Sequence, residues 1–282
     1  KPINLKNSIN IWIVNEFNCV LENLNENLIS YRFNEAADVI YKFFWNYYCD
    51  WYIELIKPSL SEQKSSEEIT EIRNVSSWIL FNSLSIINPF MPYITETVAK
   101  DYFGSKELLI SSKWPEKCPI SDNNNAKNEI NFLISLLTEI RIIRSELSIP
   151  YKQKLDLLIK NNESLKLTTI RKYEKIISDI SKLSSIKIVD NNFPKGSATG
   201  VVEDVSIGIP LSVLINLDDE IIRLKKEINK VEEEIKKFEQ NLNNLNFINR
   251  APEKVVNDLK DKKKIQIVKK NKLNEALNRL EF

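Results

Sequence analysis

The sequence predicts a mainly α protein in three parts: an antiparallel helical bundle, a small α/β linker domain and a C-terminal antiparallel coiled-coil hairpin. Three observations lead to this prediction. Apolar residues recur at helical spacing through residues 1–150. Short stretches of strand-like alternation then interrupt that spacing over residues 151–216. From residue 217 to residue 282 the apolar residues return with heptad spacing, which is typical of a coiled coil.

Five helices joined by short links are expected in the bundle. The expected helices are about 8–27, 34–58, 67–87, 92–104 and a last one from residue 130 that breaks before Pro150. Asn34 is placed to cap the second helix and Pro58 to close it. Gly104 occupies the position of a helix-ending glycine. The asparagine-rich run 121–129 is expected to be a solvated connector.

The second expected helix is crowded with aromatic residues between Tyr41 and Tyr52. Exposed rings can act as stacking platforms for nucleic-acid bases. Aromatic residues at helical spacing are far more often core residues, and these lie nearly all round the helix. We therefore interpret them as buried on more than one face. Trp12 and Trp114 are likewise interpreted as core residues.

The α/β part is expected to contain strands at 154–160 and 185–190, with a helix at about 169–183 between them. Residues 200–211 alternate in the manner of a β-hairpin. Asp204 and Gly208 lie near its expected turn regions.

The first leg of the hairpin has an unbroken heptad seam. Its apolar positions are Leu217, Ile221, Leu224, Ile228, Val231, Ile235, Phe238, Leu242 and Leu245. An irregular break follows, and a second helix runs from Glu253 to the end. The second leg allows two registers: a seam near Leu259, Lys263, Gln266 and Lys270, or a shifted seam on Ile265 and Val268. The residues alone do not decide between them.

Composition excludes several classes of chemistry. The chain has 282 residues, no histidine and only four glycines, so histidine acid–base catalysis is excluded and a glycine-rich phosphate loop is not expected. Its 40 basic and 39 acidic residues give no overall cationic character. Cys19, Cys49 and Cys118 form no paired motif, which argues against disulfides and a thiolate zinc site and favours a reducing cytoplasm. No apolar run is long enough to span a membrane. We expect no catalytic residue, metal site or cofactor on this segment.

Several stretches resemble the C-terminal part of the valine–tRNA ligases, which are class I aminoacyl-tRNA synthetases. These stretches are FNEAADVIYKFFWNYYCDWYIELIKP (33–58), INPFMPYITE (87–96), ISSKWP (110–115), IRIIRSELSIP (140–150) and NFINRAPEKVV (246–256). The bundle motifs would also suit the isoleucine and leucine ligases. The isoleucine ligases commonly end in a cysteine-rich zinc module, whereas this chain ends in a heptad hairpin, so the resemblance favours valine.

The resemblance implies that catalysis and editing lie on domains other than those present in this chain. Family members bind ATP with Mg²⁺ on a catalytic domain that carries HIGH and KMSKS motifs, and they edit on another domain. The chain has no histidine, and its only methionine lies in FMPYI, so neither motif is present. We expect a segment of a cytoplasmic, monomeric ligase that begins inside the bundle, one helix short. Its partners would be valine tRNA and the upstream catalytic and editing domains of the same polypeptide.

The resemblance further implies that the bundle recognises the anticodon and the hairpin arm meets the outer corner of the tRNA. The second leg is basic, with ten basic and five acidic residues from Arg250 to Phe282. The candidate tRNA-binding residues of the arm are Arg250, Lys254, Lys260, Lys262, Lys263, Lys264, Lys269 and Lys270. Those of the bundle and its end are Arg141, Arg144, Lys152 and Lys154. The alternatives are a solvated helix face, salt-bridge partners, and a coiled coil that serves a structural or interaction role.

Overall fold

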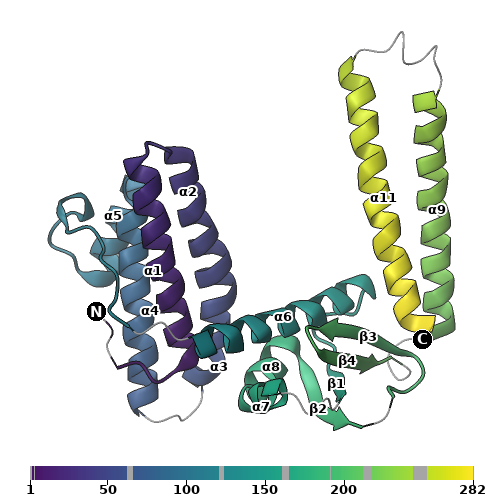
Figure 1. The fold of residues 1–282 in the computed structure, drawn as a ribbon, viewed down its shortest axis with the longest axis horizontal. Helices are drawn as coiled ribbons and strands as arrows, with labels where there is room; N and C mark the ends of the chain where they lie inside the picture. Colours follow the sequence, from purple (N-terminus) through teal and green to yellow (C-terminus); the bar gives the residue numbers. More distant parts are fainter. Residues whose placement is uncertain are drawn as a thin grey trace. The chain divides into compact units, whose positions relative to one another are not determined.

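A computed structural model describes residues 2, 4–61, 66–120, 124–160, 165–190, 192–211, 217–243 and 253–281. The chain forms two compact units, Lys1–Ile134 and Ser135–Phe282 (Figure 1). Most of the described residues are helical, and one small sheet and a C-terminal helix pair complete the fold. The predicted fold class is confirmed. Its division into three domains remains a prediction.

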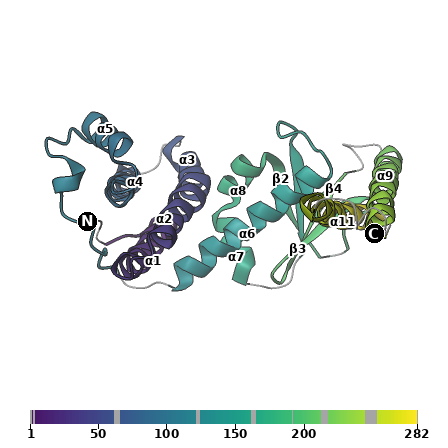
Figure 2. The same cartoon turned by 90° about the horizontal axis from the view of Figure 1, so that it is seen from above.

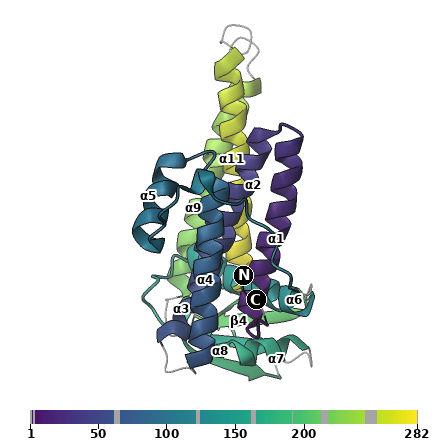
Figure 3. The same cartoon turned by 90° about the vertical axis from the view of Figure 1, so that its left-hand side faces the viewer.

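The first unit is a helical bundle. Its elements are α1 (Ser8–Ile29), α2 (Phe33–Lys42), the π-helical η1 (Phe43–Tyr52), α3 (Ile53–Ser61), α4 (Ser66–Ile87), α5 (Pro92–Phe103) and the short 3₁₀ turn η2 (Leu109–Ser111). Helix α6 (Asn124–Glu146) follows. The helices α1, α2 and α4 pack side by side (Figure 1 and Figure 3). Gly104 caps α5 with φ +61°, as predicted, because a glycine adopts this left-handed conformation without strain.

Aromatic residues form the core of this bundle. Trp12, Phe17, Phe43 and Tyr52 are fully buried. The ring of Phe17 lies 5.4 Å from that of Phe43, centroid to centroid. The hydroxyl of Tyr52 donates a hydrogen bond to Asn10 Oδ1 at 2.9 Å, which satisfies two polar groups inside the core. The interpretation of Trp12 as a core residue is confirmed.

Four details of the bundle differ from the predictions. Helix α2 begins at Phe33, so Asn34 is inside it rather than capping it. Pro58 lies within α3 instead of ending the helix. Trp114 is partly exposed, and its indole N–H donates to Asn25 Oδ1. Residues 124–129 form the first turns of α6, and residues 121–123 lie outside the described part of the chain.

The second unit contains a four-stranded mixed sheet. Its strands are β1 (Leu155–Lys160), β2 (Leu183–Val189), β3 (Ser197–Val202) and β4 (Val205–Pro210), in the order β2-β1-β4-β3. Strands β1 and β2 are parallel, and β4 is antiparallel to both β1 and β3. Two short helices, α7 (Leu165–Lys172) and α8 (Glu174–Ser181), replace the single helix predicted between β1 and β2.

The β3–β4 hairpin turns at Glu203 and Asp204, where Glu203 has φ +55°. Gly208 lies inside β4, so its expected place near a turn was wrong. A Cβ at Gly208 would lie 2.7 Å from a ring carbon of Phe193, which shows that this ring lies directly on the strand. The glycine is therefore required for close packing, and a strand glycine gives no turn signal of its own.

The two faces of the sheet differ in character. The face that carries Leu157, Ile159 and Ile207 is buried. Helix α6 crosses this face so closely that a Cβ at Gly200 would lie 2.5 Å from Glu139 Oε1 (Figure 2). The opposite face is more polar, because the alternation of strand residues places Lys160, Thr199 and Ser206 there.

The C-terminal helices α9 (Leu217–Asn243) and α11 (Glu253–Glu281) form the predicted antiparallel pair (Figure 1). We call this pair the arm. Across the described residues of the chain, no helix is both long enough and apolar enough to cross a lipid bilayer.

Candidate RNA-binding surface

The first leg of the arm follows the predicted heptad seam. Leu224, Ile228 and Val231 are buried, and Ile235 and Phe238 continue the line as half-buried residues. Residues at this spacing lie on one stripe of a helix. Helix α9 therefore presents its apolar stripe to α11, and its remaining faces are exposed.

The second leg adopts the first of the two registers that the sequence allowed. Leu259, Lys263, Gln266 and Lys270 are half-buried along the contact with α9. Ile265 is 65% exposed and Val268 is 55% exposed, which excludes the shifted seam. The helix thus turns polar residues inward and two apolar residues outward, the reverse of the usual heptad preference.

Two ion pairs explain how polar residues occupy the seam. Lys263 Nζ lies 3.0 Å from Glu239 Oε1, and Lys270 Nζ lies 2.8 Å from Glu232 Oε1. The hydrogen bond from Lys270, together with its charge, lowers the pKa of Glu232. Each lysine therefore binds a carboxylate of the facing helix. We assign Lys263 and Lys270 to holding the hairpin together, although both were candidates for RNA contact.

The other lysines of α11 whose side chains are described lie outside the seam. Lys260, Lys262, Lys264 and Lys269 are exposed on α11. Lys264 pairs with Asp261 at 3.6 Å, but both side chains are largely exposed, so this pair is weak. Among the described residues, the other three lysines have no ion pair within 4.0 Å. Lys254 is in α11 but its side chain is not described, and Arg250 lies outside the described residues. The four exposed lysines lie on two sides of α11, Lys260 and Lys264 on one and Lys262 and Lys269 on the other, where each can reach a phosphate.

Arg144 has a different environment from the other candidates. It is only 6% exposed. Its guanidinium donates hydrogen bonds to the carbonyl oxygens of Pro150 (3.2 Å), Gln153 (2.9 Å), Ser181 (2.7 Å) and Lys182 (3.1 Å). Burial lowers the pKa of Arg144, against an opposing effect of Tyr151. The buried guanidinium joins the end of α6 to the α8–β2 turn, so the expectation of RNA contact is corrected to a structural role.

The remaining candidates near the end of the bundle are accessible. Arg141, Lys152 and Lys154 are exposed, and Arg141 lies on α6 only one turn before Arg144. The structure therefore separates the predicted pair: Arg141 faces solvent and Arg144 faces the interior. The sequence shows both as arginines on one helix, and only the packing of the α8–β2 turn distinguishes them.

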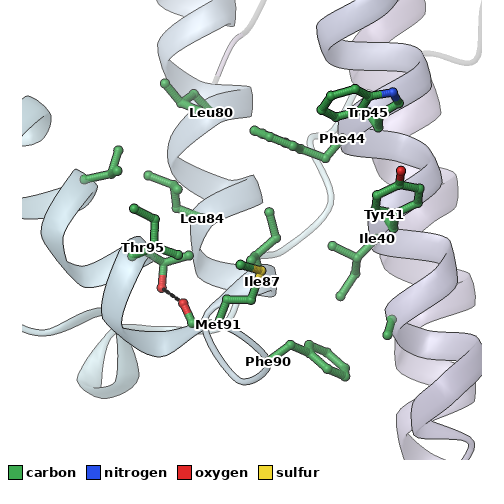
Figure 4. A pocket seen from close by; sticks show the side chains of 13 residues that line it. Ile40, Tyr41, Phe44, Trp45, Leu80, Leu84, Ile87, Phe90, Met91 and Thr95 are labelled. Carbon is green, nitrogen blue, oxygen red and sulfur yellow. Dashed lines mark hydrogen bonds between the residues drawn. The ribbon is translucent and has the colours of Figure 1, made fainter.

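The bundle also contains an open apolar hollow that the sequence analysis missed (Figure 4). Its volume is about 530 Å³. One wall comes from α2 and η1, including Tyr41 and Trp45, and the other from α4, α5 and the turn between them, including Met91. Tyr41 is 63% exposed and Trp45 is 54% exposed, so these two rings are not core residues, whereas Phe43, Tyr48 and Tyr52 of the same aromatic stretch are buried. No charged side chain lines the hollow, which makes it unsuitable for phosphate.

Comparison with known proteins decides the family. Residues 10–159, which are more than half of the chain, match the family model described as the anticodon-binding domain of tRNA ligase. The chain belongs to this family. The match includes the bundle, α6 and most of β1, so all four bundle candidates lie within this anticodon-binding domain. Residues 216–281 match a second model, described as the valyl tRNA synthetase tRNA binding arm, and this range contains α9 and α11.

Relatives of the chain agree with both matches. The valine–tRNA ligase of Gluconobacter oxydans is 32% identical over 281 residues, which are 99% of this chain and 31% of the relative. Those of Oceanobacillus iheyensis and Zymomonas mobilis are 33% and 34% identical over 95% and 96% of the chain. The chain spans about 31% of the length of these relatives. The predicted resemblance to valine–tRNA ligases is confirmed, and the isoleucine and leucine alternative is not favoured.

Proposed function

We propose that this chain is the tRNA-binding portion of a valine–tRNA ligase, the enzyme that attaches valine to its tRNA with ATP. Two family matches support this proposal because they follow one another along the chain in the order bundle, then arm. The observation that carries it is that the exposed lysines of α11 lie on the element that matches a tRNA-binding arm.

In this proposal the anticodon-binding bundle reads the anticodon and the arm meets the outer corner of the tRNA. Lysine–phosphate contacts position an RNA without reading its sequence, whereas unstacked bases are read by their edges and by stacking. Lys260, Lys262, Lys264 and Lys269 would make the phosphate contacts. Arg141, Lys152 and Lys154 are the corresponding proposals beside the bundle.

The chemistry would belong to other parts of the same polypeptide. ATP with Mg²⁺ and the editing reaction are proposed for catalytic and editing domains outside this chain, which spans about a third of its relatives. We propose a monomer, because α11 covers the apolar seam of α9 within one chain. A cytoplasmic setting is supported by the cysteines Cys19, Cys49 and Cys118, which are all free thiols.

Equilibrium binding tests the proposed function. The chain is titrated against labelled valine tRNA at low salt, with a valine tRNA of altered anticodon and an unrelated RNA duplex as competitors. The proposal predicts that unlabelled valine tRNA competes best and that affinity falls steeply as salt rises. Equal competition by the duplex would contradict it. Light scattering tests the interaction-module alternative, for which the mass would rise with protein concentration.

A further inference from the structure

The polar face of the sheet carries a hollow that belongs to neither the arm nor the helical bundle. Its volume is about 320 Å³. The groups that matter for binding come from β1, from the segment before β3, and from β3 and β4. They are Lys160, Asn192, Phe193, Ser197, Thr199 and Ser206. The hollow is therefore built on strands, which hold its lining more rigidly than loops would.

The strand register explains why these side chains meet. Thr199 is opposite Gly208, and Val201 is opposite Ser206, so Ser197, Thr199 and Ser206 share one face. Ile159 is opposite Ile207, which places the next residue, Lys160, on that same face. The ring of Phe193 lies on Gly208 and forms one side of the hollow.

One buried hydroxyl of the hollow has no hydrogen-bond partner in the part of the chain that the structure describes. Ser197 is 2% exposed, and among the described residues its Oγ has no hydrogen-bond partner. A buried hydroxyl without a partner costs free energy, which a ligand that accepts its hydrogen bond would recover. The hydroxyls of Thr199 and Ser206 are half-buried beside it, and the amide of Asn192 is exposed.

The charge of the hollow is positive. Lys160 is half-buried, and among the described residues no carboxylate oxygen lies within 4.0 Å of its Nζ. The nearby hairpin turn carries Glu203 and Asp204, but Lys166 pairs with both, 2.8 Å from Asp204 Oδ1. Lys166 thus offsets part of the negative charge of this turn.

We propose that this hollow binds a phosphate group of an RNA backbone, with Lys160 as the cation and the hydroxyls of Ser197, Thr199 and Ser206 as donors. Lysine, serine, threonine and asparagine side chains are common donors to nucleic-acid phosphates. The ring of Phe193 offers an apolar wall for the adjoining ribose. The choice of RNA as the source of this phosphate rests on the proposed function. The site would add an RNA contact in the part of the sequence that lies between the bundle and the arm.

Lys160→Met tests the site in the full chain, with Lys187→Met as its matched control. Lys187 is opposite Leu158, so it lies on the same face of the sheet, but it is exposed and does not line the hollow. The first measurement follows amide NMR shifts during titration with inorganic phosphate. The second measurement determines the affinity for valine tRNA at several salt concentrations. Ser206→Ala serves as a second variant that keeps the charge and the fold.

The proposal predicts that phosphate shifts the amides of Ser197, Thr199 and Ser206 in the wild type but not in Lys160→Met. It predicts that Lys160→Met weakens RNA binding about tenfold and lowers the salt slope by about one, with little effect of Lys187→Met. RNA binding by Lys160→Met that equals the control would overturn it. If the wild type binds no RNA, the proposed function fails; phosphate shifts would then identify a site for a free phosphate, and their absence would dismiss the site as well.

Discussion

Lys270 of α11 reaches across the arm to Glu232 of α9, with 2.8 Å between Nζ and Oε1. One heptad earlier on α11, Lys263 makes the same kind of contact with Glu239 at 3.0 Å. These two ion pairs between antiparallel helices specify one register, because a shift of either helix along its axis would separate the charges of both pairs. The arm thus uses part of its basic leg for its own structure and leaves the rest for a partner.

A double-mutant cycle on Lys270→Met and Glu232→Gln measures this relationship. Both side chains are about a third exposed, so solvent screens the pair and we expect a small favourable coupling in the free energy of unfolding. Urea denaturation of the two single variants and the double variant gives this value. Additive effects would show that the pair contributes no stability and that the apolar seam alone sets the register.

The arm should loosen in acid. The pKa of Glu232 is lowered in the folded state by its hydrogen bond to Lys270, so its contribution is fully present above the ordinary value of 4.5. That contribution is lost as the pH falls through the folded pKa. The protection of amides in α9, measured as the exchange rate relative to the intrinsic rate at each pH, should therefore fall below about pH 4.5. In Glu232→Gln this acid-dependent change should be smaller, and an identical pH profile would refute the assignment.

Replacement of Arg144 by Met should destabilise the second unit strongly. Its guanidinium satisfies four backbone carbonyl oxygens inside the protein, and their loss leaves buried acceptors unpaired. We expect a loss of about 3 kcal/mol in the free energy of unfolding. Arg141→Met is the matched control, since this arginine is exposed on the same helix and should change stability by about 0.5 kcal/mol or less. Equal effects of the two variants in thermal unfolding would contradict the structural role of Arg144.

Tyr52→Phe should cost about 1 kcal/mol of stability, because it removes the hydroxyl that donates to Asn10 Oδ1 and leaves that buried acceptor unpaired. Burial also raises the pKa of Tyr52 above its ordinary value. Tyr41→Phe is the control, because this tyrosine is mostly exposed. Urea unfolding of both variants measures the change in the free energy of unfolding that each substitution causes. A Tyr52→Phe protein as stable as the wild type would mean that the hydrogen bond contributes nothing net.

The sequence was most informative where one periodic pattern dominated. The described side chains of α9, from Ile221 to Leu242, follow the predicted seam, since the apolar residues alternate four and three without a break. The side chain of Leu217 and residue Leu245 lie outside the described part of the chain. Helix α11 was ambiguous because Lys263, Gln266 and Lys270 occupy its seam. The opposing carboxylates of Glu239 and Glu232 make the two lysine positions acceptable. That pairing depends on the geometry of two helices, which periodicity along one helix does not contain.

For the candidate site, too, the sequence pattern does not show which residues from different elements come into contact. Exposed and buried basic residues look alike in sequence, so Arg141 and Arg144 received the same prediction although only Arg144 is enclosed by carbonyl oxygens. The hollow beside Lys160 was missed because its members lie on three strands and become neighbours only through the register of the sheet. Gly208 gave a misleading turn signal, since its role is to accommodate the ring of Phe193.

The salt dependence of valine tRNA binding tests the central claim most directly. The measurement compares the wild type with a triple variant, Lys262→Glu, Lys264→Glu and Lys269→Glu, which replaces three exposed lysines of α11. The account predicts that the triple variant keeps its helical content and thermal stability, binds at least about tenfold more weakly, and has a salt slope smaller by about two to three. Unchanged affinity with an unchanged slope would contradict an RNA-binding role of these lysines.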